Sequence, residues 1–516
     1  MFQSLIERWN AIARHRKACV FAIGAIALLV RVSLLPLYPV PVASVHDEFS
    51  YLLAGETFAA GRLTNPTPPL WVHFETFHEL MRPTYMSMYP PGQGALLAIG
   101  IVLFGHPWWG VWLSVGVMCS ALTWMLYEWF PPGWALLGSV LGVLQFAIAH
   151  YWMDSYWGGS LAAIGGCLTL GAYPRMIRRQ RILDGVVAGI GLGVMANTRP
   201  YEMLSLGLVF AGALFLWAWR QPGRTRLRTA VALGVPALAA LTPFLAATLI
   251  EARAVTGSVL ALPHEFAVRQ VGVWPTFVFQ RPGPIPAYHH EEMRKFYVEW
   301  QPGYEDARHW GTLRGLIPGI GGRLSVARNC YLPERWYLPF ALASFLALWS
   351  RRIRFLSACV IAAFLGNGLV NSLVPHYLAP VLGAMMALHL TFLRWVRAWN
   401  LKAFAALLLL MCGLFGHRYY HFAGAPPNFA ATRQNMIHQL QADGRRHLVF
   451  VRYRPSHNVG DEWVFNGPDI PSQQVIWARS MLPDEDKELA EFARDRVAWV
   501  VDADDAHPAL RPWPSP

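Results

Sequence analysis

The chain has 516 residues, of which 54% are hydrophobic and only 14% are charged. Soluble domains carry about 25% charged residues, so this composition excludes an ordinary soluble enzyme and indicates a membrane protein. The formal net charge of +12 does not indicate nucleic-acid binding, because the basic residues form short blocks between apolar segments.

Long apolar segments recur along the chain and predict a polytopic α-helical membrane protein. A span needs roughly 20 apolar residues. About eleven segments approach that length: 18–38, 108–128, 134–152, 157–174, 182–198, 201–219, 229–250, 336–350, 355–373, 378–394 and 401–417. The fifth and sixth are separated only by Arg199-Pro200, so 182–219 forms either two spans or one broken helix. The first segment has no small-residue cleavage site, which favours a retained span over a signal peptide.

Arg and Lys residues gather in five blocks between these segments. The blocks are Arg14/Arg16/Lys17, Arg175/Arg178/Arg179/Arg181, Arg220/Arg224/Arg226/Arg228, Arg351/Arg352/Arg354 and Arg394/Arg397/Lys402. One topology places all five on the cytoplasmic side, as the positive-inside rule requires. The N-terminus is then cytoplasmic, and loops 39–107 and 251–335 lie outside. We therefore expect a multi-pass protein of the plasma (bacterial inner) membrane with an extracytoplasmic, periplasmic active site.

Two segments differ from the spans. Residues 93–104 are too short to cross a bilayer and follow Tyr89-Pro90-Pro91-Gly92, a helix start signal, which predicts a helix at the outer interface. The tail is polar, with strand-length apolar runs at 447–453, 474–478 and 496–501. Helical spacing recurs at 431–442 and 484–494. We expect a transmembrane module over 1–425 and a small C-terminal α/β domain over 426–516, on the outer face.

Ionisable side chains collect in the loops that this topology places outside. The candidates are His46, Asp47, Glu48, Arg82, Asp154, Arg199, Glu202 and His376. Charged groups near the bilayer are costly, and they usually pair, line a cavity or take part in chemistry. Four separate loops supply these side chains to one plane, which predicts a site at the outer end of the spans.

Simpler explanations remain open for several of the ionisable residues. Asp47 and Glu48 suit a helix N-cap and first turn, and Asp154 suits an interfacial acid flanked by aromatic residues. Arg31 can extend from the first span to the headgroups, and His376 can be a plain turn residue. The spacing of His73 and His78 with Glu75 and Glu79 would suit a metal on a helix, but an exposed polar face is the favoured interpretation.

At four places the chain resembles the GT-C superfamily of polytopic glycosyltransferases, within it the family 39-like and aminoarabinose-transferase-like enzymes. Val45-His46-Asp47-Glu48-Phe49-Ser50-Tyr51 resembles the Asp-Glu motif after the first span. Tyr89-Pro90-Pro91-Gly92 resembles the Pro-Pro segment that opens a juxtamembrane helix. Asp154 resembles the second acid of these enzymes, and Pro375-His376-Tyr377-Leu378-Ala379-Pro380 resembles a late aromatic-Leu-x-Pro segment. The resemblance covers nearly the whole chain.

The resemblance implies transfer of a hexose or pentose, with inversion, from a polyprenyl-phosphate donor to a lipid, glycan or protein acceptor. In that reaction we expect Asp47 to be the general base, with Glu48 orienting the acceptor or helping the base. Asp154 would position the acceptor or balance nearby cations. The substrate-binding residues are then expected to be His46, Arg82, Tyr89, Arg199, Glu202, His376 and Tyr377. Aminoarabinose transferases have a basic residue before the Pro pair where Tyr89 stands here. Either Arg82, Arg199, His376 or a loop residue then holds the phosphate, or the donor differs. A divalent metal cofactor is left open.

Three other functions remain in competition. A transporter or flippase of a lipid-linked or small anionic substrate would also have polar groups and broken helices, but with acids at the bilayer midplane. An outer-face transferase of another group would need a metal cluster or an activated Ser/Thr nucleophile, and neither stands out. In a binding or assembly protein, the tail domain would do the work.

Overall fold

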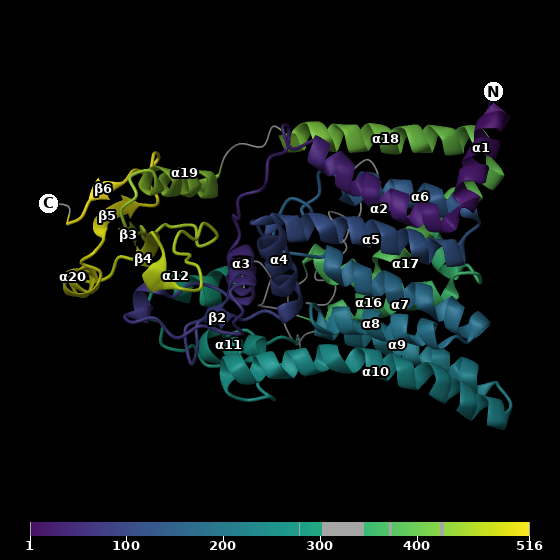
Figure 1. Ribbon diagram of the computed structural model, residues 1–516, viewed down its shortest axis with the longest axis horizontal. Helices are drawn as coiled ribbons and strands as arrows, with labels where there is room; N and C mark the ends of the chain where they lie inside the picture. Colours follow the sequence, from purple (N-terminus) through teal and green to yellow (C-terminus); the bar gives the residue numbers. More distant parts are fainter. Residues whose placement is uncertain (1, 278, 302–344, 371–373, 424–427, 515–516) are drawn as a thin grey trace.

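The computed structural model describes residues 2–277, 279–301, 345–370, 374–423 and 428–514. Long helices run side by side, and a small unit with a sheet lies at one end of them (Figure 1). Within the described ranges, five helices are long and apolar enough to cross a membrane: Trp108–Trp129, Pro200–Trp219, Leu227–Thr256, His376–Trp399 and Leu401–Tyr420. The predicted helical membrane architecture is confirmed, whereas the count of eleven spans stays a prediction.

The helices follow the predicted apolar segments closely. In chain order they are α1 (Phe2–Arg14), α2 (Arg16–Ser33), α3 (His46–Ala59), α4 (Pro91–Phe104), α5 (Trp108–Trp129), α6 (Pro132–Phe146), α7 (Ser160–Arg179), α8 (Ile182–Ala196), α9 (Pro200–Trp219), α10 (Gly223–Thr256), α11 (Pro263–Val271), α12 (Glu291–Arg294), α16 (Arg354–Leu369), α17 (Leu382–Trp399) and α18 (Leu401–Ala423). The segment 182–219 is therefore two helices, interrupted where Arg199 precedes Pro200. Most of the span predicted at 336–350 lies outside the described residues.

The basic blocks lie at the end of the bundle away from the sheet. In Figure 1 the starts of α2, α8, α10 and α18 lie at that end, where four of the five blocks occur. The short helices α3 and α4 lie at the opposite end and run across the long helices (Figure 1). This arrangement agrees with the predicted topology, and the direction of the bundle in the membrane stays a prediction.

Helix α4 confirms the short apolar helix expected after Tyr89-Pro90. Pro91 occupies the first helical turn, where a missing N–H is tolerated, and Gly105 ends the helix at φ +76°. Gly94 lets α4 pack closely on α3, because a Cβ there would lie 2.6 Å from the Cβ of Ala54. The two short helices thus form one close-packed pair at the end of the bundle.

The C-terminal unit holds a four-stranded sheet in the order β4-β3-β5-β6. The strands β3 (His447–Arg452), β4 (Val475–Arg479) and β5 (Val497–Asp502) are parallel, and β6 (Arg511–Pro512) is antiparallel to β5. Helices α19 (Phe429–Gln441) and α20 (Pro483–Phe492) accompany the sheet. Every predicted strand and helix is present within about three residues. The two-residue β6 was missed because it is too short to show a pattern.

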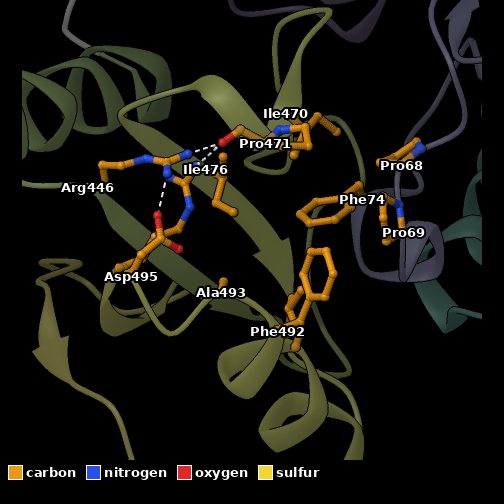
Figure 2. Close-up of a pocket in the computed structure, with 12 residues that line it drawn as sticks. Pro68, Pro69, Phe74, Arg446, Ile470, Pro471, Ile476, Phe492, Ala493 and Asp495 are labelled. Carbon is orange, nitrogen blue, oxygen red and sulfur yellow. Dashed lines mark hydrogen bonds and ion pairs between the residues drawn. The ribbon is translucent and has the colours of Figure 1, made fainter.

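A pocket of about 170 Å³ separates the first loop from the C-terminal unit. Figure 2 shows Pro68, Pro69 and Phe74 facing Ile476 and Phe492 across it. Two arginines line its polar end, but both donate to the carbonyl oxygen of Pro471, and Arg446 also pairs with Asp495. Because these donors already have partners, the pocket is a packing junction rather than a candidate anion site.

One buried arginine joins the C-terminal unit to the loops beside it. Arg479 at the end of β4 is 1% exposed and pairs with Glu462, which is also 1% exposed. Its Nε donates to the carbonyl oxygen of Glu75 at 2.9 Å, and its Nη1 lies 3.7 Å from Glu292. The guanidinium therefore links three chain segments at once.

We expect Arg479→Ala to destabilise the C-terminal unit by about 3–5 kcal/mol, because it leaves the Glu462 carboxylate buried without its partner. Limited proteolysis of the purified protein measures this as faster cleavage within 428–514. The matched control is Arg445→Ala, which removes an exposed pair with Asp443 and should change stability by less than about 1 kcal/mol. Equal cleavage rates for the two variants would contradict the assignment.

Candidate functional site

Asp47 lies in the first turn of α3, at the end of the bundle. Its Oδ1 accepts a hydrogen bond from the hydroxyl of Tyr89, and its Oδ2 lies 3.4 Å from Nδ1 of His46. His78 lies close by, with its ring centroid 4.9 Å from that of His46. A single carboxylate therefore meets one phenol and two imidazoles, contributed by α3 and the first loop.

Glu48 is held in a different way from its neighbour. Its Oε2 accepts the backbone N–H groups of Ser44 (2.9 Å) and Val45 (3.1 Å), and its Oε1 accepts that of Tyr156 (2.8 Å). The residue is 2% exposed. The capping explanation thus applies to Glu48, which also fastens the start of α3 to the loop after α6.

The pKa values of the two neighbouring carboxyls move in opposite directions. Burial raises the pKa of Glu48 to about 7, although the three backbone donors oppose the rise. Burial would raise the pKa of Asp47 too, but His78, His46 and Tyr89 together hold it below its ordinary value. For Glu48, burial is a larger influence on the pKa than repulsion from the carboxylate of Asp47. Asp47 is ionised at neutral pH.

Aromatic rings and a cation lie beside Asp47. The ring of Tyr89 stacks on that of Tyr51 at 4.5 Å between centroids, and Arg199 lies over the ring of Tyr377 at 4.6 Å. Burial raises the pKa of Tyr51 to about 12, and the positive charge of Arg199 lies near enough to oppose this rise. Glu202, one turn into α9, is buried and acts on the same group. Arg199, at the break between α8 and α9, therefore lies beside the aromatic residues that surround Asp47.

His376 completes this cluster from the short helix η6 (Pro375–Val381). It is 1% exposed, with its Nδ1 3.4 Å from the hydroxyl of Tyr151 and its ring 5.1 Å from that of Trp157. Asp47 acts electrostatically on both His376 and Tyr377. The structure thus brings together seven predicted residues around Asp47: His46, Glu48, Tyr89, Arg199, Glu202, His376 and Tyr377.

Two predicted site residues lie elsewhere. Asp154 is bound to Arg31, with Oδ1 2.7 Å from Nη2, and its Oδ2 accepts the N–H of His150 at 3.2 Å. Arg31 is 0% exposed and donates to the carbonyl oxygen of Tyr38 at 2.8 Å, so it does not extend to the headgroups as the simpler explanation supposed. Arg82 is exposed and lies over the ring of Trp71 at 4.5 Å.

The loop 251–335 covers His46 with a short helical segment. The segment Lys295–Trp300 continues α12, and its Phe296 ring lies 4.8 Å from that of His46. His290 anchors the segment to the first loop, through Nε2 at 2.7 Å from the carbonyl oxygen of Val72. This contact is what a lid over the site requires.

His46, Asp47 and His78 form a candidate metal site. One ligand atom from each lies within 4.8 Å of the others. The Nδ1 atoms of His46 and His78 are buried and have no hydrogen-bond partner in the part of the chain that the structure describes. Two imidazoles and a carboxylate suit a first-row transition metal. His78 adopts φ +62°, a conformation rare outside glycine, so its ring is held there by the surrounding fold.

The metal-binding helix suggested by His73, His78, Glu75 and Glu79 does not form. His73 bonds the carbonyl oxygen of Arg479, and Glu75 accepts from His289. Only His78 of that set reaches the candidate metal site. His78 follows the Asp-Glu motif by about thirty residues within the same loop. That shared loop was the only sequence signal linking the two, and hydrophobic periodicity does not show that they meet.

Comparison with known proteins gives a fold and no close sequence relative. No protein-family model matches the sequence, and neither does any curated protein. The structure of ArnT from Cupriavidus metallidurans bound to undecaprenyl phosphate has a TM-score of 0.51 at 15% identity, over 93% of this chain and 92% of that one. The oligosaccharyltransferase of Archaeoglobus fulgidus tethered to an acceptor peptide has a TM-score of 0.50 at 15% identity, over 94% of this chain and 69% of that one.

We expect His78→Ala to weaken binding of Mn²⁺ or Zn²⁺ by at least about tenfold, since it removes one of three ligands. Metal content after dialysis, measured by inductively coupled plasma mass spectrometry, reports the loss. His438→Ala removes an exposed imidazole on α19 and should leave the content unchanged. Equal metal in both variants, or none in the wild type, would exclude the candidate metal site.

We expect Asp154→Asn to lower the stability of the detergent-solubilised protein by about 3–5 kcal/mol, because Arg31 then keeps a buried, uncompensated charge. Combining Arg31→Met with Asp154→Leu should cost less than the sum of the single changes. Thermal unfolding monitored by circular dichroism measures both effects. A variant Asp154→Asn that unfolds normally but cannot turn over would instead support the catalytic role first expected of Asp154.

Proposed function

We propose that this chain, an integral membrane protein with the GT-C fold, transfers a sugar from a polyprenyl-phosphate carrier to an acceptor. The fold is supported by the likeness to ArnT and to the oligosaccharyltransferase. The observation on which the function rests is the Asp47 cluster. An ionised carboxylate, a guanidinium and several aromatic rings meet at one end of an apolar bundle, where a lipid tail and a polar headgroup can bind together.

Asp47 is the proposed general base. Its ionised carboxylate accepts the proton of the acceptor's attacking group as that group bonds to the anomeric carbon, and the carrier phosphate leaves from the opposite face. Such a displacement inverts the anomeric centre. Glycosyl transfer passes through an oxocarbenium-like state, in which the sugar already carries positive charge when the nucleophile arrives. A weakly basic carboxylate therefore suffices, which agrees with the low pKa of Asp47.

The other residues of the cluster position groups around Asp47. Glu48 holds the first turn of α3 in place through backbone N–H groups and does not touch the acceptor in this scheme. Tyr89 fixes the carboxylate through its hydroxyl. Arg199 faces the leaving phosphate and stabilises the negative charge that develops on it. It thereby takes the role of the basic residue that aminoarabinose transferases have where Tyr89 stands here.

A metal would be held by His46, Asp47 and His78. It would supply positive charge beside the phosphate. The segment Lys295–Trp300 covers His46 and excludes water from the sugar, which suppresses hydrolysis. The C-terminal unit, proposed as a separate domain over 426–516 on the outer face, holds this covering loop in place through Arg479.

A transporter explains the site less well. Transporters place their acids near the middle of the spans, whereas Asp47 lies on α3, which crosses the end of the bundle (Figure 1). The sugar and the acceptor, whether lipid, glycan or protein, are not specified by these contacts.

We expect Asp47→Asn to lower the rate of sugar transfer by about 100-fold or more, because the amide cannot accept the proton. Transfer from radiolabelled lipid-linked sugars in membranes measures the rate, and thermal unfolding confirms that the variant folds. Asp484→Asn, an exposed change on α20, should retain full activity. Full activity in a correctly folded Asp47→Asn variant would remove Asp47 as the base.

A further inference from the structure

Three aromatic rings stack where α5, α7 and α16 meet, at the end of the bundle that carries the basic blocks. The ring of Phe355, in the first turn of α16, lies between those of Tyr173 and Trp129. Its centroid is 3.8 Å from that of Tyr173 and 6.1 Å from that of Trp129, with interplanar angles of 13° and 9°. Trp129 ends α5, and Tyr173 lies in the last two turns of α7. The stack therefore fixes the start of α16 against the ends of two other helices.

Two arginines approach the hydroxyl of Tyr173 from different helices. Arg354 begins α16 directly before Phe355, and Arg220 follows the last residue of α9. Both residues are exposed, and the charges of both act on the Tyr173 hydroxyl. Helices α9 and α16 pack on each other, and the ring of Phe210 in α9 lies 6.2 Å from that of Tyr173. One hydroxyl and two guanidinium groups thus gather where three helices meet.

The arginines of the neighbouring α7 differ, because a carboxylate pairs with them. Glu128 in the last turn of α5 forms ion pairs with Arg175, Arg178 and Arg179. By contrast, the sequence has no Asp or Glu over 203–250 or over 335–442, the two stretches that hold Arg220 and Arg354. The positive charge of these two arginines is therefore not balanced by any acid in their own stretches of the chain.

Exposed tryptophans indicate the depth of this end in the membrane. Trp219 directly precedes Arg220 and is 58% exposed, and Trp349, two residues before Arg351, is 86% exposed. Trp399, which ends α17, is 81% exposed. Tryptophan concentrates where a membrane meets water, at the level of the lipid headgroups. The arginines beside these tryptophans therefore lie where lipid phosphates lie.

We propose that Tyr173, Arg220 and Arg354 bind the phosphate of an anionic phospholipid at the basic end of the bundle. The phosphate accepts hydrogen bonds from two guanidinium groups and one phenol, and such bonds are strong because the groups are charged. A zwitterionic lipid would bring its own cation beside the arginines, which disfavours it. The acyl chains lie along exposed apolar side chains of α9, among them Phe215 and Leu216. This surface lies at the opposite end of the bundle from the proposed site of sugar transfer.

The test measures lipid binding to the purified full-length protein in an uncharged detergent by native mass spectrometry. The ligands are phosphatidylglycerol, phosphatidylcholine with the same acyl chains, and inorganic phosphate. One variant combines Arg220→Gln with Arg354→Gln, and a second, Tyr173→Phe, removes the hydroxyl but keeps the ring stack. The matched control combines Arg8→Gln with Arg14→Gln, which removes the same charge from exposed positions on α1 at the same end (Figure 1).

We expect phosphatidylglycerol to bind the wild type at least about tenfold more tightly than phosphatidylcholine. The double change at Arg220 and Arg354 should weaken that binding by roughly 10- to 50-fold, and Tyr173→Phe should weaken it several-fold. The control should lose less than about threefold, because α1 packs on α2 and α6 and not beside Tyr173.

Equal losses in the control and in the arginine variant would mean attraction by net charge alone and would overturn the headgroup site. Equal affinity for the two phospholipids would overturn it too, as would inorganic phosphate binding as tightly as phosphatidylglycerol. Undiminished binding by the arginine variant or by Tyr173→Phe would contradict the assigned contacts. None of these results depends on sugar transfer, so the test is independent of the proposed function.

Discussion

The site depends on the three backbone N–H groups that hold the carboxylate of Glu48. Two of them open α3 and the third belongs to Tyr156, so one side chain joins segments 108 residues apart. Because Asp47 precedes Glu48 in the same helical turn, fixing Glu48 fixes the direction of Asp47. The loop from His150 to Trp157, which Glu48 fastens, also packs against His376. A single buried carboxylate thereby sets the relative positions of residues from three parts of the chain.

Buried polar side chains in this structure include two groups with different physical roles. Arg31 with Asp154, and Arg479 with Glu462, are paired and have further hydrogen bonds to backbone carbonyls. Such pairs offset their desolvation only when both partners remain, so they fasten segments together. His46 and His78, by contrast, keep ring nitrogens without hydrogen-bond partners among the residues that the structure describes. Unpaired polar atoms are costly to bury, and at a functional site a ligand can supply the missing partner.

Much of the fold follows from patterns that the sequence displays directly. The apolar segments and the Pro-Pro signal predicted α4 and most long helices, and apolar runs of strand length predicted all but one strand of the C-terminal sheet. These features depend on local composition and spacing. The break at Arg199-Pro200 could not be assigned from sequence, because one kinked helix and two helices have the same hydropathy. Packing of α8 on α7 and α10, and of α9 on α16, distinguishes them.

The site was predicted in part, and the failures share a cause. Asp47, Tyr89, Arg199 and His376 were identified by motif and by topology, which place residues on one side of a membrane. Topology does not say which way a side chain points. Asp154 lies on the expected loop, but it pairs with Arg31 in the first span, and that pairing depends on α2 packing beside α6 and the loop that follows it.

Asp47 differs from the paired acids because its contacts leave room for a change of charge. Asp154 is paired with Arg31, and Glu48 accepts three backbone N–H groups that fix the start of α3. Asp47 is held by a phenol and approached by imidazoles, all of which can shift a hydrogen bond by rotation or by a change of protonation. A proton can therefore reach Asp47 without breaking the contacts that hold α3. Of the three acids, Asp47 alone is held by side chains whose hydrogen bonds can be rearranged as it takes up a proton.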